Sequence, residues 1–308
     1  MVDASLRPAR QLKAEGWTPR QFRQGLADGS LIRLTRGVYA AAVEHETPAQ
    51  LHLRRAAALL SMHREEVVVS HASAAIAHGL AVQVSNPGRI HVTVPPPGRG
   101  RRRSGYHVHQ APLDAGEIVT LDGLRVTSLA RTLVDLARTT PYAWGVIAAD
   151  QVLRRSMSRE ALRAALDAGG VRRGVEQARR AIDFADPRSQ SPAESASRVI
   201  MARAGLPVPE LQFQVIGPDG WVATSDFAWP EHRLVGEMDG KSKYSTGLRP
   251  GQTPEDAVLD DLRRQEAIRQ AGFWITRWGW AEAWDVRALG ELVRGGLVQA
   301  SGLVREVA

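Results

Sequence analysis

The sequence predicts a multidomain α/β protein, and three observations lead to this fold class. The chain has 308 residues, which is enough for two or three domains. Its apolar content of 44% is that of a globular protein with buried cores. The turn-rich segment 186–192 precedes a region in which helix and strand patterns alternate. We therefore expect domains at residues 1–45, 46–185 and 191–308.

Composition excludes several classes of protein. The chain has no cysteine, so it contains neither disulfides nor thiolate metal sites. No apolar run approaches the ~20 residues of a membrane span, and the N-terminus has no apolar signal core. We expect a soluble cytoplasmic protein with no membrane partner.

Charge is distributed unevenly along the chain. The formal net charge is +7, yet residues 191–308 hold 13 Lys and Arg against 16 Asp and Glu, which leaves +10 on residues 1–190. A strongly basic region is typical of a surface that binds a polyanion. An arginine bias of the genome is the alternative explanation.

The first 45 residues follow the order helix, turn, helix, hairpin, which predicts a winged helix-turn-helix. A helix over residues 6–15 ends at Gly16, and Thr18-Pro19 begins a second helix with Thr18 as N-cap. Phe22 and Leu26 mark its expected buried face. Short strands are expected at 31–34 and 38–40.

The arginines of this segment are suited to DNA. The outer face of the second helix, where a recognition helix meets the major groove, carries Arg20, Arg23 and Gln24. The expected wing carries Arg33 and Arg36, in positions suited to phosphate contact. The alternative is a small helical cap whose arginines are only solvated.

Residues 46–185 predict a mixed α+β and helical scaffold. Helices are expected at 51–62, 70–80 and 127–137, with further helices to about 185, and strands at 67–69, 90–94 and 106–109. The last two strands are expected to pair through a hairpin loop that contains Arg101, Arg102 and Arg103. That loop either grips a DNA backbone or is a disordered charged tip.

Three histidines lie on the paired strands of this scaffold. Symmetric pairing places His91 opposite His109, with His107 on the same face, and three histidines together can bind zinc. No further ligand is apparent nearby, and exposed strands often carry histidine. The sequence by itself therefore favours a role without metal.

The C-terminal region contains a hairpin that gathers carboxylates. Apolar alternating runs at 222–229 and 234–239 flank a four-residue loop, and symmetric closure places Trp229 opposite Leu234 and Asp226 opposite Glu237. Asp239 follows on the same face. Opposed carboxylates repel, so a cation between them is expected, and Mg²⁺ or Mn²⁺ suits oxygen ligands. A register shifted by one residue would separate the two acids.

Only three lysines occur in the chain, and two of them, Lys241 and Lys243, follow this hairpin directly. In an arginine-rich sequence, a compact ammonium here suggests a role in the site, and a solvated turn is the alternative. Upstream, Ser191-Pro192-Ala193-Glu194 opens a helix, and this S-x-x-E pattern predicts a capping box in which Glu194 bonds back to the N–H of Ser191.

Two stretches resemble the AbiEi antitoxins of abortive-infection toxin–antitoxin systems. The segment Gly29-Ser-Leu-Ile-Arg-Leu-Thr-Arg-Gly-Val-Tyr39 is similar to their N-terminal winged-helix domain, and SHASAAIAHGL and TSLARTLVDLA are similar to their middle region. The resemblance implies a protein that represses its own promoter and has a toxin as partner.

The pattern Asp226, then Glu237-x-Asp239-Gly240, resembles the active-site hairpin of the PD-(D/E)XK nucleases, especially the branch similar to very-short-patch-repair endonucleases. For residues 191–308 it implies a restriction-endonuclease-like α/β domain with a mixed sheet. It also implies that Asp226 and Glu237 hold the metal. A helix glutamate before the hairpin can help to hold it, which is the alternative to the capping role for Glu194, because both roles cannot be filled at once. The sequence departs from the pattern because Asp239 stands where the family has lysine, which leaves Lys241 or Lys243 to replace it.

The sequence as a whole favours a DNA-binding, metal-dependent endonuclease that hydrolyses phosphodiester bonds, in phage defence or a toxin–antitoxin context. The alternative is a non-catalytic repressor or antitoxin whose nuclease-like fold is degenerate.

Overall fold

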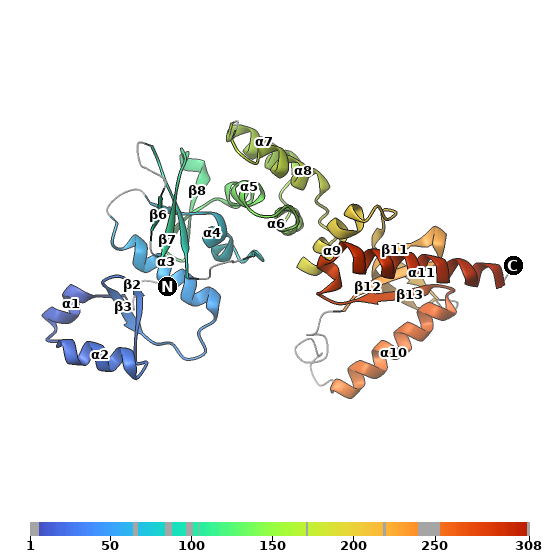
Figure 1. Cartoon of the computed structure of the whole chain (residues 1–308), viewed down its shortest axis with the longest axis horizontal. Coiled ribbons are helices and arrows are strands. Elements are labelled where there is room, and N and C mark those ends of the chain that lie inside the picture. Colours follow the sequence, from blue (N-terminus) through green and yellow to red (C-terminus); the bar gives the residue numbers. More distant parts are fainter. Residues whose placement is uncertain are drawn as a thin grey trace. The chain divides into compact units, whose positions relative to one another are not determined.

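A computed structural model of the chain describes residues 6–63, 67–83, 88–96, 101–103, 105–170, 172–217, 220–239 and 253–306. The chain divides into two compact units. The first combines Met1–Ala148 with Ser156–Asp183, and the second combines Ala149–Arg155 with Phe184–Ala308. Each unit contains sheets and helices of its own, which confirms a multidomain α/β protein with mixed sheets (Figure 1).

The described residues form helices and strands along the whole chain. The α-helices are α1 (Ala9–Ala14), α2 (Pro19–Ala27), α3 (Pro48–Leu60), α4 (His71–Ala77), α5 (Leu129–Thr139), α6 (Tyr142–Arg154), α7 (Arg159–Ala168), α8 (Val175–Phe184), α9 (Pro192–Arg203), α10 (Pro254–Gln270) and α11 (Val286–Glu306). The strands are β1 (Arg7–Pro8), β2 (Leu31–Thr35), β3 (Val38–Ala41), β4 (Val68–Val69), β5 (Ile90–Val94), β6 (Arg101–Arg103), β7 (Tyr106–Gln110), β8 (Ile118–Leu121), β9 (Leu124–Thr127), β10 (Glu210–Ile216), β11 (Val222–Trp229), β12 (Leu234–Met238) and β13 (Trp274–Trp278). Short 3-10 turns are η1 (Ala115–Glu117), η2 (Pro230–His232) and η3 (Glu282–Trp284). None of the described helices is long and apolar enough to cross a membrane.

The N-terminal segment contains two helices and a three-stranded sheet in the order β1-β3-β2. Thr18 caps α2, as the sequence predicts, and it also forms a capping box with Gln21. The expected burial of Leu26 is wrong, because that side chain is 42% exposed and Gly25 takes the buried position. A Cβ on Gly25 would lie 3.1 Å from the Cβ of Leu31, so only a glycine lets α2 pack this closely on β2.

A six-stranded sheet in the order β6-β7-β5-β4-β9-β8 forms the centre of the first unit. The expected hairpin of residues 90–94 and 106–109 is wrong, because β5 and β7 run parallel and β6 pairs with the outer edge of β7. The strands β8 and β9 have no counterpart in the sequence prediction. Valine, isoleucine and leucine side chains from this sheet pack against α3 and α4 to make one core.

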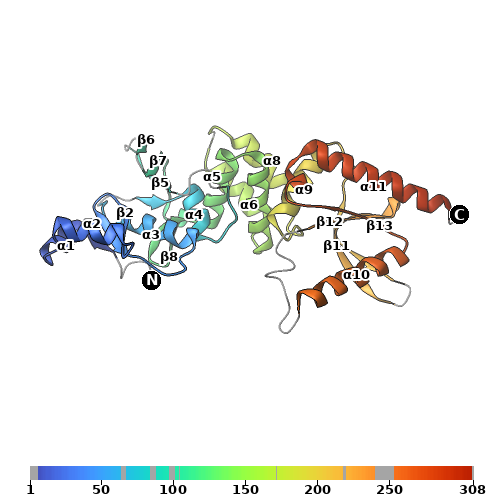
Figure 2. The same ribbon diagram turned by 60° about the horizontal axis from the view of Figure 1, so that its bottom comes forward.

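The second unit contains a four-stranded mixed sheet in the order β10-β11-β12-β13, in which only the β12–β13 pair is parallel. Helices α9 and α11 cover one face and α10 covers the other (Figures 1 and 2). Phe227, Trp229, Leu234 and Met238 contribute to the larger core, as the sequence predicts. On the opposite face, a smaller core forms around Val235 and includes side chains from β10, β11 and α10.

The turn-rich segment 186–192 is held by buried polar contacts. The backbone N–H of Asp186 donates to Asp150 at 2.7 Å, and Ser189 is buried. Arg198 forms an ion pair of 2.9 Å with Asp150 and also donates to Ser189. Burial raises the pKa of Asp150, and the charge of Arg198 opposes this rise.

Gly236 on β12 provides a test of this packing. An added Cβ would lie 2.6 Å from Cη2 of Trp278, which is anchored by a hydrogen bond of 2.8 Å from its indole N–H to Ser197. We expect Gly236→Ala to lower the free energy of unfolding by about 1–3 kcal/mol, measured by urea denaturation.

The matched control is Gly295→Ala on α11, where an added Cβ meets no atom within 4 Å. Alanine is the better helix former, so this variant should equal or exceed the wild type by up to about 1 kcal/mol. Equal stability of wild type and Gly236→Ala would contradict the close packing of Trp278 on β12.

Candidate functional site

The hairpin of β11 and β12 has the predicted register. Trp229 pairs with Leu234, and Phe227 pairs with Gly236. The turn η2 is followed by Arg233, and the positive φ of 52° at this residue closes the loop. Side chains alternate along each strand, so Asp226 and Glu237 lie on the face of the sheet that α10 covers.

Glu237 is 1% exposed and bound by two arginines. Arg277, its neighbour on the parallel strand β13, donates to its carboxylate at 2.7 Å. Arg264 of α10 donates to the same carboxylate at 2.5 and 3.3 Å. The positive charge of these guanidinium groups compensates the buried carboxylate, and neither arginine was predicted to lie there.

Two further acids complete this network. Asp261 of α10 accepts from Arg277 at 2.9 Å, and Asp239 lies 3.8 Å from the same guanidinium. Burial acts to lower the pKa of Arg277, but the hydrogen bond to Asp261 and the charges of Glu237 and Asp239 raise it overall. The guanidinium is therefore charged at every pH at which the protein is folded.

Asp226 is half buried and bonded to the backbone. Its carboxylate accepts from the N–H of Met238 at 2.9 Å. The hydrogen-bonded ladder between β11 and β12 extends only to the pair Phe227 and Gly236. Beyond this pair, the Asp226 side chain supplies a hydrogen bond between the two strands. Asp226 thus secures the end of the hairpin.

Glu194 on α9 is buried and lies near Asp226. Its own N–H donates to Ser191, the helix cap, at 3.1 Å. Its carboxylate accepts from the N–H of Gln190 at 2.8 Å and from the side chain of Gln212 at 3.1 Å, so the predicted return bond to Ser191 is wrong. Burial raises the pKa of Glu194, and the charge of Asp226 raises it further.

The remaining predicted residues of this site are not all visible. Lys241 and Lys243 lie outside the described residues. In the parts of the chain that the structure describes, three histidines of the first unit bring their donor atoms within 4.8 Å of one another. The described carboxylates form no such group of three. Metal ligation by Asp226, Glu237 and Glu194 stays a prediction.

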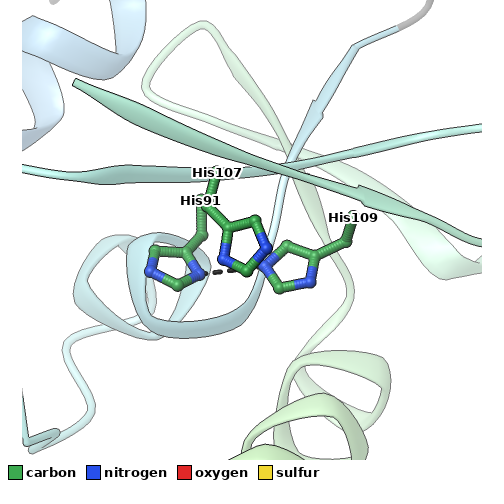
Figure 3. Close-up of side chains that lie close together, drawn as sticks. All are labelled: His91, His107 and His109. Carbon is green, nitrogen blue, oxygen red and sulfur yellow. Dashed lines mark hydrogen bonds between the residues drawn. The ribbon is translucent and has the colours of Figure 1, made fainter. Parts of the chain in front are cut away.

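The histidines lie on two adjacent parallel strands. His91 on β5 is directly beside His107 on β7, and His109 follows two residues along (Figure 3). The nitrogen atoms His91 Nδ1 and His109 Nε2 are 3.0 Å apart. The ring of His71 stacks on His109 with centroids 3.5 Å apart. Burial, first of all, holds the pKa of His71 well below its usual value, and neighbouring His91 and Arg131 add to this.

The predicted DNA-binding side chains occupy exposed positions where they are described. Arg20, Arg23 and Gln24 are exposed on α2, and Arg33 and Arg36 are exposed on and beside β2. The backbone of Arg101, Arg102 and Arg103 forms β6, paired with β7, and their side chains lie outside the described part.

Comparison with protein families gives a match for the middle part of the chain. Residues 67–183 match the family described as the AbiEi antitoxin C-terminal domain. The match spans the six-stranded sheet from β4 onward and helices α4 to α7, with nearly all of α8. It includes both stretches, SHASAAIAHGL and TSLARTLVDLA, that carry the predicted resemblance. It begins after the N-terminal segment, and of the second unit it includes only Ala149–Arg155.

The chain belongs to a family of mycobacterial relatives. It is 32% identical over 262 residues to the uncharacterized proteins MT2308 and Rv2248 from two strains of Mycobacterium tuberculosis, which covers 80% of this chain and 93% of each relative. A crystal structure of the RV2827C protein from Mycobacterium tuberculosis covers 63% of this chain and 75% of that one, with 21% identity and a TM-score of 0.41.

The arginines around Glu237 yield a stability prediction. Replacing Arg277 with methionine removes one of two charges that compensate a buried carboxylate, so Arg277→Met should lower the free energy of unfolding by about 3–5 kcal/mol. Chemical denaturation at neutral pH measures this loss.

The matched control is Arg287→Met, which breaks an exposed ion pair of 2.8 Å with Glu291 on α11. We expect no measurable change there. Similar small effects of both substitutions would mean that Glu237 does not depend on Arg277 for its burial.

Proposed function

We propose that this protein is a DNA-binding regulator of the toxin–antitoxin type, with the N-terminal segment as its DNA-binding part. The match of residues 67–183 to an antitoxin domain supports the biological context. The arrangement of α2 beside the β2–β3 hairpin supports the DNA-binding role, and it is the observation on which the proposal mainly rests.

The helix α2 has the form of a recognition helix. One side packs inward, where Phe22 contacts Trp17 and Tyr39 edge to face with centroids 5.6 and 5.3 Å apart. The opposite side presents Arg20 and Arg23 to solvent. A helix with a packed inner face and a cationic outer face near its N-terminus suits the major groove.

The β2–β3 hairpin has the form of a wing. Its turn contains Gly37, whose φ of +80° is a conformation that favours glycine. Arg33 and Arg36 at the hairpin line a cavity of about 1110 Å³ together with Arg55 of α3. Three arginines around one opening create a positive potential that favours phosphate groups.

A toxin protein is the second partner that we propose. This partner follows from the description of the matching family as an antitoxin domain, and the two mycobacterial relatives are described only as uncharacterized. The proposal assigns DNA and the toxin to different parts of the chain, because the antitoxin domain begins at residue 67 and α2 ends at Ala27.

The DNA-binding proposal predicts a change in salt dependence. Arg20→Ala combined with Arg23→Ala removes two phosphate-neutralising charges, so the affinity for DNA should fall. The negative slope of log K against log salt should become shallower by about 2. Fluorescence anisotropy with duplex DNA from the protein's own upstream region at several salt concentrations measures both quantities.

The charge-matched control is Arg163→Ala combined with Arg179→Ala, two exposed residues of α7 and α8 that pair with Asp183 and Asp167. This variant should bind DNA as the wild type does. An equal loss of affinity in both double variants would show that net charge, and not the face of α2, determines binding.

A second candidate function is a Mg²⁺-dependent endonuclease, and the pair of Glu194 and Asp226 is the observation that favours it. Burial of Glu194 beside a second carboxylate is unfavourable without a cation, as the raised pKa of Glu194 indicates. Two acids held this way suit a hard divalent ion that activates water. Glu237 can join such a site only if Arg264 and Arg277 release its carboxylate.

Metal-dependent stability tests this second function. The raised pKa of Glu194 means that the folded state prefers its neutral form, so its contribution to stability is lost as pH rises through the folded-state pKa. Glu194→Gln should therefore stabilise the metal-free protein at neutral pH. If Mg²⁺ binds, it raises the unfolding temperature of the wild type but not of Glu194→Gln.

Cleavage of plasmid and single-stranded DNA with Mg²⁺ or Mn²⁺ is the companion measurement, with Asp226→Asn as the inactive variant. Identical cleavage by wild type and variant, or no stabilisation by metal, would leave the regulator as the remaining function.

A further inference from the structure

The three histidines of the first unit form a candidate metal site that is separate from the carboxylates. In the parallel β5–β7 pair, His91 and His107 are direct partners and His109 lies two residues further on β7. Residues two apart on a strand share a face, so the register places all three side chains on the same side of the sheet (Figure 3). Their donor nitrogens lie within 4.8 Å of one another.

These distances are close to those of a zinc site. Nitrogen ligands about 2.0–2.1 Å from a tetrahedral Zn²⁺ are about 3.3 Å apart. The separation of 3.0 Å between His91 Nδ1 and His109 Nε2 is near this value, and the donor atoms of all three rings lie within 4.8 Å of one another. Three imidazoles suit Zn²⁺ and similar transition metals, whereas Mg²⁺ prefers oxygen ligands.

The rings are supported by a second layer of buried groups. His71 stacks on His109, and His71 itself is held by a hydrogen bond of 3.0 Å between its Nδ1 and the Ser70 hydroxyl. The carboxylate of Asp135 lies 3.9 Å from the same nitrogen of His71. Because Ser70 holds His71, the stacking of His71 restrains the ring of His109.

The surroundings leave one coordination position open. The three histidines line a cavity of about 950 Å³, together with Arg89, Arg138 and others. The cationic side chains oppose a bare cation, and the nearby acids offset part of this effect, since Asp135 lies 3.0 Å from Arg131 and 3.6 Å from Arg138. A water molecule or an anion as the fourth ligand suits the remaining positive charge of the cavity, as in three-histidine sites with an open position.

We propose that His91, His107 and His109 bind one Zn²⁺ ion, with the fourth position open to the arginine-lined cavity. This site lies within the antitoxin-type domain, in the first unit, and it does not depend on the proposed DNA-binding or nuclease functions.

Zinc binding by the full chain tests the proposal. The protein is prepared without a histidine tag, stripped with a chelator and titrated with Zn²⁺ in a calorimeter. We expect one equivalent to bind, and we expect Co²⁺ in its place to show the intense visible absorption of a four-coordinate site. Zn²⁺ should also raise the unfolding temperature, because it binds only the folded arrangement.

Single substitutions locate the ion. His91→Ala and His109→Ala should each weaken Zn²⁺ binding by roughly 100-fold or more, since loss of a ligand exceeds the 10–100-fold cost of a change in its support. The control is His232→Ala, an exposed histidine of the β11–β12 turn in the second unit, which should bind zinc as the wild type does.

Two results would overturn the proposal. The first is that the wild-type protein binds no stoichiometric Zn²⁺ or gives a six-coordinate Co²⁺ spectrum. This test uses the wild type alone, so it does not require any variant to fold. The other is undiminished binding by folded His91→Ala and His109→Ala proteins, which would place the ion elsewhere.

Discussion

A carboxylate buried in the interior of a sheet needs opposite charge, and this requirement organises the second unit. Glu237 lies on the inner strand β12 and is 1% exposed, so its charge is costly unless it is paired. Arg277 reaches it from the neighbouring strand and Arg264 from α10. The same interaction therefore connects the sheet to α10 beside the smaller apolar core on that face, while the larger apolar core lies on the other face with α9 and α11.

The first unit meets the same requirement with different residues. Arg131 is 4% exposed and pairs with Asp135 and Glu117, so its guanidinium connects α5 to the segment before β8. The histidine rings lie beside this network, on a face determined by the parallel register of β5 and β7. In both units the buried polar groups lie where the face of a strand meets a helix. The candidate sites are found at these positions.

Local patterns account for the parts of the fold that the sequence predicted well. The β11–β12 register follows from alternation and loop length, and the pair of Trp229 and Leu234 confirms it. The cap of α2 follows from Thr18 and Pro19, which act on neighbouring backbone groups alone. The antitoxin-type middle region follows from two short motifs, and the family match over 67–183 contains both.

The sequence by itself determined the helix caps, the alternation of the strands and the side on which Asp226 and Glu237 lie, because these depend on residues a few positions apart. Only the tertiary structure decided what the carboxylates meet, since Arg264 and Arg277 are 27 and 40 residues from Glu237 along the chain. A signal was present in Arg277, a charge next to Trp278 in a strand with three apolar residues, because a charge in such a strand needs a partner of opposite charge. The parallel order of β5 and β7 likewise depended on the insertion of β6, because strand direction is set by the chain's path and not by the side chains that face each other.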